Sequence, residues 1–228
     1  PFLVNLRYDK DASMQYLRDI YNSVLLKDVV QRNNIRDVEL LERMILYLLD
    51  NVGHSFSARS ISNYLKQENR KVSAETILNY IKACCDAYLF IQLRREDLQG
   101  KKILSVNEKY YSVDHGLRES ILGTNARNID QILENIVCME LLRRGYTVTI
   151  GKNGEKEIDF VAKKNKDKLY IQVAYLLAGS GTIEREFGIY DSIRDHYPKY
   201  VLSLDEFDMS RDGIKHLNIR DFLLSKEF

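Results

Sequence analysis

The sequence predicts an α+β protein, in which a helical domain precedes an α/β domain with a mixed central sheet. Three observations predict this class. Apolar residues recur at helical spacing up to residue 88, two β-like runs follow between residues 89 and 106, and helical and β-like segments alternate from residue 129 onward. Strands and helices in that order are expected to form a sheet flanked by helices.

The composition describes an ordinary globular protein and excludes several functional classes. A chain of 228 residues can form one large domain or two small ones. Its 34 basic and 33 acidic residues give a net charge of +1, so a polyanion would need a local basic patch. Apolar runs such as Met44–Leu49 are far shorter than the ~20 residues that span a bilayer, so we expect no membrane partner.

The cysteines indicate a reducing compartment. Cys84, Cys85 and Cys138 are an odd number and lie in apolar surroundings, which favours buried thiols over disulfides or a metal cage. We therefore expect a cytoplasmic protein. The chain starts at Pro1 rather than Met, and we expect it to be an excised or processed piece of something longer.

The first segment, residues 1–36, is expected to be a helical tail or linker. Apolar residues at helical spacing predict one helix over 11–33, and Asp11 and Ser13 near its start are suitable for capping. Asn33 and Asn34 can end it.

The second segment, residues 37–123, has the element order of a winged helix-turn-helix domain. Its three predicted helices cover 38–51, 58–67 and 73–88, with Gly53 after the first and Ser73 capping the third. Two β-like runs, 89–94 and 102–106, then form a hairpin.

A winged helix predicts which residues contact DNA. The candidates share polar side chains on the third helix or basic side chains on the hairpin, and they are Ser73, Thr76, Asn79, Lys82, Arg94, Lys101 and Lys102. Such groups bind base edges or phosphates of double-stranded DNA. Glu75, Glu96 and Asp97 lie among them and repel phosphate. A structural or protein-contact role is therefore the alternative.

The third segment, residues 124–228, is predicted to be the α/β domain. We expect helices over 129–144, 184–196 and 219–224, the first ended by Gly145. The strand candidates are 146–150, 157–162, 168–176 and 200–204, and the lysine-rich stretch 163–168 is expected to be a solvated hairpin tip.

Two of these strands carry the polar residues that suggest chemistry. Alternation places Glu157, Asp159 and Val161 on one face of the first strand, and hairpin pairing is expected to put Asp159 beside Gln172. Glu134, on the preceding helix, is expected to be partly covered. A helix carboxylate and a strand carboxylate that converge over a sheet form a plausible Mg²⁺ site, so Glu134 and Asp159 are weak candidate metal ligands. The alternative is that both are partly buried acids satisfied by the backbone or by basic neighbours.

This arrangement resembles the PD-(D/E)xK nuclease superfamily. The resemblance implies that Glu134 matches the helix acid and Asp159 the strand Asp, whereas Gln172 stands at the second acid and Ala174 at the catalytic lysine. Losing one such charged group typically costs ~10²–10³ in rate, and two are missing. The resemblance therefore implies a degenerate site.

Several strings also resemble a prokaryotic family of AAA-type P-loop ATP-binding proteins. They are YLRDIYNSVLLKDVV at 16–30, KYYSVDHGLR at 109–118, EN at 134–135, EIDF at 157–160 and YPKYVL at 197–202. The resemblance covers essentially the whole chain and implies a winged-helix part followed by a restriction-endonuclease-like domain of unknown function. It also implies that an ATPase module, with its ATP and Mg²⁺, lies upstream, since no G-x-x-x-x-G-K-[ST] occurs here.

The expected function is that of a non-catalytic C-terminal region of a P-loop ATPase. It would bind DNA or a protein partner, besides its own ATPase module, and would need no cofactor of its own. Two alternatives stay open. One is a divergent Mg²⁺-dependent DNA endonuclease using Glu134, Glu157 and Asp159. The other is a winged-helix DNA-binding regulator.

Overall fold

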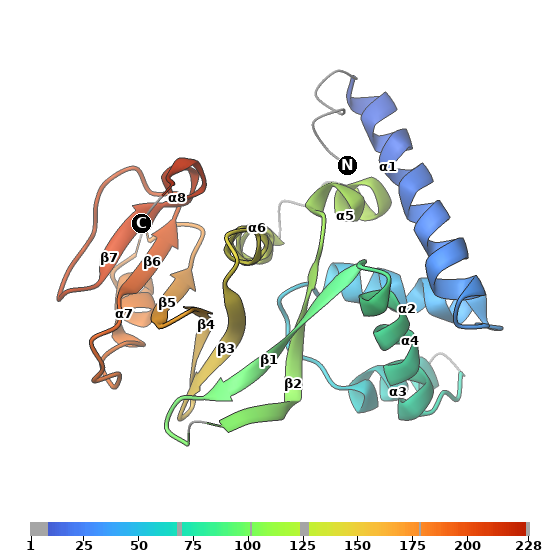
Figure 1. The fold of residues 1–228 in the computed structure, drawn as a ribbon, viewed down its shortest axis with the longest axis horizontal. Coiled ribbons are helices and arrows are strands. Elements are labelled where there is room, and N and C mark those ends of the chain that lie inside the picture. The colour runs from blue at the N-terminus through green and yellow to red at the C-terminus, as the bar shows by residue number, and fades with distance from the viewer. Residues whose placement is uncertain (1–8, 68–69, 101, 124–127, 178, 227–228) are drawn as a thin grey trace. The chain divides into compact units, whose positions relative to one another are not determined.

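The computed structural model describes residues 9–67, 70–100, 102–123, 128–177 and 179–226, without the side chains at 102, 104–107 and 180. The chain forms two compact units (Figure 1). Unit 1 comprises residues 1–92 and 109–127, and unit 2 comprises residues 93–108 and 128–228.

Unit 1 begins with the helix predicted over 11–33. The α-helix α1 (Lys10–Val24) continues into the π-helix η2 (Leu25–Gln31), so the segment is helical, but its second half has the wider helical turn. The cap prediction was wrong. Asp9, and neither Asp11 nor Ser13, accepts the N–H of Ala12 at 2.8 Å, because the helix starts one residue earlier than expected.

Three further helices of unit 1 confirm the predicted segments. They are α2 (Val38–Asp50), α3 (Ala58–Gln67) and α4 (Ala74–Asp86). Asp37 caps α2, and Ser73 caps α4 by accepting the N–H of Thr76 at 3.1 Å. The helices bury a continuous apolar cluster that includes Leu41, Ile45, Leu48, Ile61 and Ile77.

Helix α5 (His115–Leu122) was not predicted. It has only eight residues and carries Gly116 in its first turn, so its apolar period is short. Asp114 caps it by accepting the N–H of Gly116 at 2.7 Å. Arg118 of α5 is buried and donates through Nε to the carbonyl of Leu49 at 2.8 Å, which joins α5 to the end of α2.

The predicted hairpin consists of β1 (Phe90–Asp97) and β2 (Lys102–Ser112). Its outer part, residues 93–108, belongs to unit 2. There β1 pairs in parallel with β3 (Thr147–Asn153), with Arg95 opposite Ile150. The hairpin expected to act as a wing therefore supplies strands to a larger sheet.

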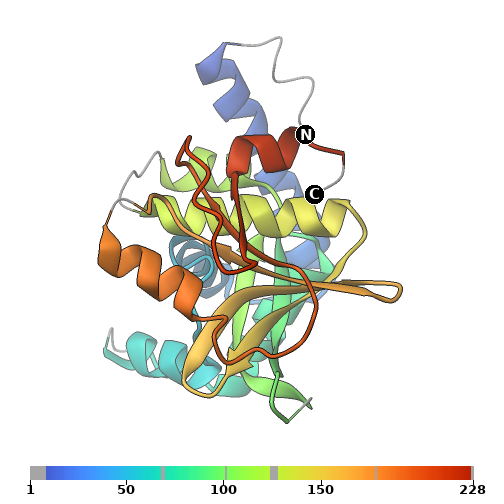
Figure 2. The ribbon, with the colours of Figure 1, turned by 90° about the vertical axis from the view of Figure 1, so that its left-hand side faces the viewer.

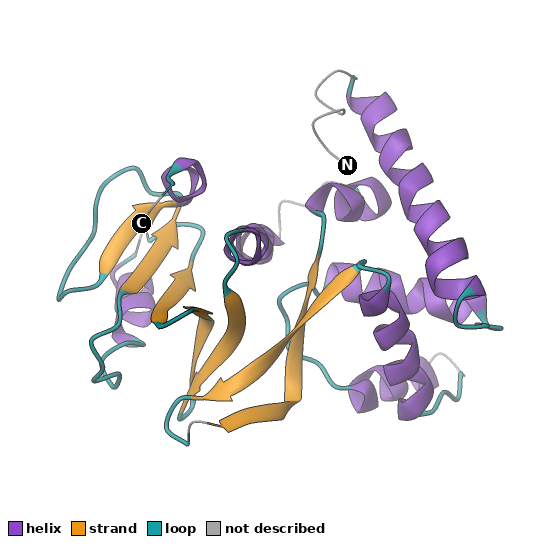
Figure 3. Cartoon of the chain, in the orientation of Figure 1, coloured by secondary structure: helices purple, strands orange, loops and turns teal. Residues whose placement is uncertain are grey.

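Unit 2 is built on that sheet, whose strand order is β2-β1-β3-β4-β5-β6-β7 (Figure 3). The additional strands are β4 (Lys156–Lys164), β5 (Asp167–Val173), β6 (Lys199–Ser203) and β7 (Lys215–Asn218). The β3–β4 and β4–β5 pairs are antiparallel, and the β1–β3, β5–β6 and β6–β7 pairs are parallel. The α+β class with a mixed sheet is confirmed.

Helix α6 (Ile129–Arg143), seen from the side in Figure 2, contacts β3, β4 and β5. Gly145 ends it with a φ of +83°, as predicted. Phe187 of helix α7 (Ser180–Gly188) packs in a separate cluster with Ile158, Tyr170 and Val201 of the sheet.

One prediction for the last third of the chain was wrong, and one strand was missed. The helix expected over 184–196 is α7, which starts at Ser180 and ends at Gly188. The chain then turns, and the hydroxyl of the buried Tyr190 donates to the carbonyl of Tyr200 at 2.7 Å. Strand β7 was missed because it is only four residues long and includes polar His216 and Asn218. The closing helix α8 (Ile219–Leu224) was predicted at its observed bounds.

Within the described ranges, no helix combines the length and the apolar character that a bilayer span requires.

Candidate functional site

The nuclease-like residues lie at an irregularity in strand β4. Val161 pairs with Thr149 and Ile158 with Gly151, so β4 contains one residue more than β3 between these two pairs. Such a β-bulge interrupts the alternation of side chains. Ile158 and Val161 pack in the same apolar cluster, and the predicted face of Glu157, Asp159 and Val161 does not form.

Gly151 shows why the bulge is tolerated. A Cβ atom at this position would lie 2.9 Å from Cγ2 of Val161 and 3.1 Å from Cβ of Ile158. The two β4 side chains therefore occupy the space above the glycine backbone, and the bulge is part of the packing of the sheet.

Asp159 and Gln172 are neighbours, as predicted. The β4–β5 register runs to the Phe160–Ile171 pair, and the next residues are linked by side chains instead. The carboxylate of Asp159 accepts the N–H of Val173 at 2.8 Å, and the side-chain oxygen of Gln172 accepts the N–H of Asp159 at 3.2 Å. Asp159 is only 6% exposed. Both polar side chains thus satisfy backbone N–H groups just beyond the end of the β4–β5 ladder.

The surroundings of this pair are packed. Ala174, at the position of the nuclease lysine, is buried among the apolar residues of the α7 cluster. Burial, and then the nearby carboxylates of Asp159 and Glu186, raise the pKa of Tyr190. The space beside Asp159 is therefore lined by an aromatic ring and apolar groups.

The other acids proposed for the nuclease-like site are Glu134 and Glu157. Glu134 lies half-buried on α6. Glu157 pairs with Arg95, with 2.5 Å between Oε2 and the guanidinium nitrogen. Among the described residues, no group of three or more His, Cys, Asp or Glu side chains could hold a metal ion. A three-carboxylate site made of Glu134, Glu157 and Asp159 gains no support.

The DNA-binding candidates of α4 divide into two pairs. The hydroxyls of Ser73 and Thr76 lie 2.9 Å apart and belong to the helix cap. Asn79 and Lys82 are exposed, and they line a depression of about 540 Å³ with Arg36. Lys82 donates to Asp86 on the next turn.

Of the hairpin residues proposed to contact DNA, the structure describes the side chain of Arg94. Arg94 is exposed on β1. Lys101 lies outside the described residues, and so does the side chain of Lys102. Next to Arg94, Glu96 is 8% exposed, and both its oxygens accept from Nζ of Lys163, at 2.6 and 2.7 Å.

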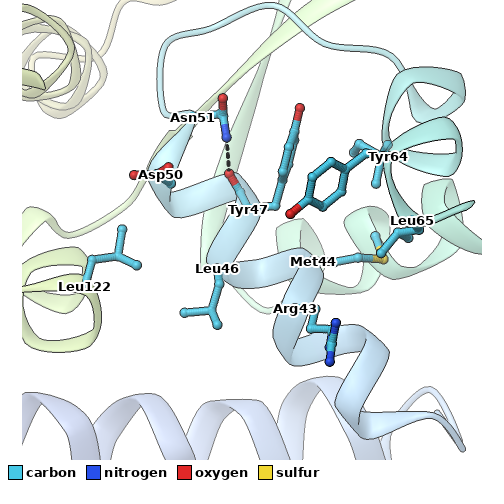
Figure 4. A pocket seen from close by; sticks show the side chains of 10 residues that line it. Arg43, Met44, Leu46, Tyr47, Asp50, Asn51, Tyr64, Leu65 and Leu122 are labelled. Atoms are coloured by element: carbon cyan, nitrogen blue, oxygen red, sulfur yellow. Dashed lines mark hydrogen bonds between the residues drawn. The ribbon is translucent and has the colours of Figure 1, made fainter. Parts of the chain in front are cut away.

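Unit 1 also carries an apolar pocket of about 460 Å³ (Figure 4). Tyr47 of α2 and Tyr64 of α3 point toward one another, with 5.8 Å between ring centroids. Leu46 is 41% exposed and Tyr64 47% exposed, so large apolar side chains border the opening. Sequence patterns assigned these residues no role beyond their place in two predicted helices.

Unit 2 contains a polar cavity of about 700 Å³ that the sequence analysis missed. Lys168 and Tyr170 of β5 line it, and so do Asp195 and Tyr197 of the segment between α7 and β6. The Nζ atom of Lys168 lies 4.5 Å from the Tyr170 ring centroid and 5.4 Å from that of Tyr197. The Tyr170 hydroxyl donates to Asp195 at 2.5 Å.

The cavity shifts the pKa of Lys168. Burial lowers the pKa of Lys168, and Lys163 adds to the effect, whereas Asp195 and Glu96 oppose it. Lys163 and Lys168 lie in paired strands, and only residues 165–166 form the turn, so the expected solvated tip is smaller than predicted. In the sequence, this site could be suspected only from Lys168 and Tyr170, which lie two residues apart on one strand. Asp195 is distant in the sequence and reaches the cavity only in the folded chain.

Comparisons with known proteins identify the family. A family described as "Domain of unknown function (DUF8612)" matches residues 3–128. The chain belongs to this family. Relatives of this chain include an uncharacterized protein of Haemophilus influenzae, 37% identical over 217 residues, in an alignment that covers 95% of this chain and 54% of the relative. An uncharacterized protein of Methanocaldococcus jannaschii is 30% identical over 222 residues, covering 96% of this chain and 49% of the relative.

The chain spans about half the length of these curated relatives. No solved structure matches it. The family and its prokaryotic relatives are thus shown, while the matched names state no activity.

Proposed function

We propose that this chain is a non-catalytic region of a cytoplasmic P-loop ATPase of the AAA type, and that it binds double-stranded DNA without cleaving it. The observation that carries the non-catalytic part is the 2.8 Å hydrogen bond from the Val173 N–H to the Asp159 carboxylate, next to the buried Ala174.

A nuclease of this fold needs its strand Asp to face a metal ion, and it needs a lysine cation nearby. Metal-assisted hydrolysis depends on carboxylates that bind the ion, which activates water and neutralises the leaving oxygen. In this chain the carboxylate of Asp159 accepts a backbone N–H. Ala174, at the position expected for the lysine, packs in an apolar cluster. The residues present fit a structural role in the sheet better than a Mg²⁺ site.

The exposed face of α4 supports a DNA partner. Asn79 and Lys82 are three residues apart on the helix and both are exposed. An amide binds adenine edges in a major groove, and an ammonium group binds phosphate or guanine. Ser73 and Thr76 would act through the cap that places the first turn of α4.

Two measurements test the proposal. First, supercoiled plasmid and branched DNA are incubated with the purified chain and Mg²⁺ or Mn²⁺, and no cleavage is expected. Cleavage that disappears in Asp159→Ala would establish the alternative, a divergent endonuclease.

Second, binding of a labelled duplex is measured by fluorescence anisotropy. Asn79→Ala/Lys82→Ala is expected to weaken binding about tenfold, since it removes one base-reading group and one phosphate contact. Asn63→Ala/Lys66→Ala is the matched control, because these residues have the same types and spacing and are exposed on α3. Equal affinity of both variants and the wild type would exclude α4 as the DNA-contacting helix.

A protein partner is the second candidate, and the apolar pocket of unit 1 favours it. Partly exposed Leu46 and Tyr64 border a pocket with room for one or two apolar side chains. If a protein segment binds here, Leu46→Asp abolishes that complex in an affinity measurement with the partner, whereas Leu78→Asp, at an exposed position of α4, leaves it intact.

A further inference from the structure

A second pocket of unit 2, with a volume of about 750 Å³, has a strongly basic lining. Arg143, Arg144 and Tyr146 line it at the end of α6, and Lys164 of β4 and Lys226 after α8 complete its polar surface. Among the lining residues that the structure describes, none is acidic.

Arg144 is the structural anchor of this basic pocket. It is nearly buried, and one terminal nitrogen donates to the carbonyl oxygens of Phe222 and Ser225 at 2.7 and 2.9 Å. Its guanidinium carbon also lies 4.8 Å from the centroid of the Phe222 ring. These contacts hold the segment after α8 against the end of α6.

Glu140, one turn earlier on α6, accepts hydrogen bonds from both arginines. It accepts two hydrogen bonds from Arg143, both at 2.7 Å, and one from Arg144 at 2.6 Å. The hydrogen bond from Arg143, followed by the one from Arg144, lowers the pKa of Glu140, so the carboxylate stays charged. One carboxylate therefore faces two guanidinium groups, and no acid stands beside Lys164 and Lys226 among the described residues that line the pocket.

Lys164 and Lys226 supply the exposed charge. The Nζ atom of Lys164 donates to the Arg144 carbonyl at 2.8 Å and lies 5.7 Å from the centroid of the Tyr146 ring. Lys226 and Arg143 are exposed, Arg143 with 70% of its side chain accessible. An anion in the pocket would meet ammonium and guanidinium donors beside an aromatic face.

We propose that this basic pocket binds a phosphate ester group, in the form of the backbone phosphate of a nucleic acid. Arginine matches phosphate oxygens with paired N–H donors, and lysine adds point charge. Tyr146 offers a ring on which a base can stack. The assignment to nucleic acid rests on the proposed DNA-binding function, while the phosphate chemistry stands on the pocket alone.

The test compares two phosphate sources on the wild type and on Lys164→Gln/Lys226→Gln. Duplex binding is measured by fluorescence anisotropy over a salt series, and tripolyphosphate binding by calorimetry. The double variant is expected to weaken duplex binding at least about tenfold and to reduce the slope of log affinity against log salt by about 1.8. Lys152→Gln/Lys215→Gln removes the same charge from exposed positions outside the pocket and is expected to bind like the wild type.

Each outcome decides between the ideas. If the duplex binds the wild type and both double variants equally, the basic pocket does not contact the duplex, and the assignment to nucleic acid is refuted although the chain still binds DNA. If only tripolyphosphate binds, and only when Lys164 and Lys226 are present, the phosphate site stands and the DNA partner is refuted. If neither probe depends on these lysines, the inference is overturned. Arg143→Gln, which leaves the Lys164–Arg144 contact in place, repeats the test if the double variant does not fold.

Discussion

Asp159 and Val173 are joined across β4 and β5 by a 2.8 Å hydrogen bond in which the Val173 amide donates to the Asp159 carboxylate. The bond uses an acid that the nuclease-like pattern would assign to a metal ion. It also links β4 and β5 just beyond the last pair of their ladder, Phe160–Ile171. Loss of the Asp159 carboxylate would leave this buried N–H without its acceptor, which is costly.

The first prediction concerns the stability role of Asp159. Asp159→Ala leaves the buried Val173 N–H without its acceptor, so we expect the free energy of unfolding to fall by about 1–3 kcal/mol. Asp159→Asn keeps an oxygen acceptor and is expected to cost less. Equilibrium unfolding in urea measures both. An increase in stability on either substitution would instead indicate an acid kept for binding at the expense of folding.

The second prediction concerns the bulge. Gly151→Ala places a Cβ 2.9 Å from Cγ2 of Val161, and we expect a loss of about 1–3 kcal/mol because the sheet has to shift. Gly181→Ala is the matched control, since nothing lies within 4 Å of its Cβ position and it is in the first turn of α7. The control is expected to be neutral or stabilising by up to about 1 kcal/mol. Thermal and urea unfolding of both variants checks the contrast, and equal effects would contradict it.

The third prediction is a pH dependence centred on His216. Its Nδ1 accepts the N–H of Met209 at 3.3 Å, and its Nε2 lies 2.8 Å from the Ser203 hydroxyl. Burial lowers the pKa of His216, against the opposing effect of Asp205 and Asp208. The unfolded chain therefore binds this proton more readily than the folded chain, and stability falls as the pH drops below about 6.5.

Unfolding free energies at pH 7.5 and pH 5 test this assignment. His216→Asn is expected to lose less stability between the two pH values than the wild type does. His196→Asn, at an exposed position, serves as the control and is expected to keep the wild-type pH dependence. If His216→Asn keeps the full dependence, other groups are responsible.

The fourth prediction concerns thiol reactivity. Burial, and to a smaller extent Cys85, raises the pKa of Cys84 to about 12. Because the thiolate is the reactive form, Cys84 is expected to react slowly with iodoacetamide at pH 8. The half-buried Cys85 is expected to react first. Peptide mass spectrometry over time gives the order, and equal labelling of the two residues would refute it.

Much of the fold could be predicted because helices depend on local patterns. The apolar period located α2, α3, α4, α6 and α8, and Ser73 and Gly145 marked ends that the structure confirms. Hairpin spacing also placed Asp159 beside Gln172. Short elements were missed, since α5 and β7 contain too few apolar residues to show a period.

The sequence by itself determined the α+β class and the order of most elements, since these follow from residue identity and local period. Only the tertiary structure decided what Asp159 does, because the bulge depends on how Val161 and Ile158 pack above Gly151. It alone also brought the arginines of α6, Lys164 and Lys226 around one pocket. Contacts between distant segments depend on the packing of the whole unit, and no local pattern of residues encodes them.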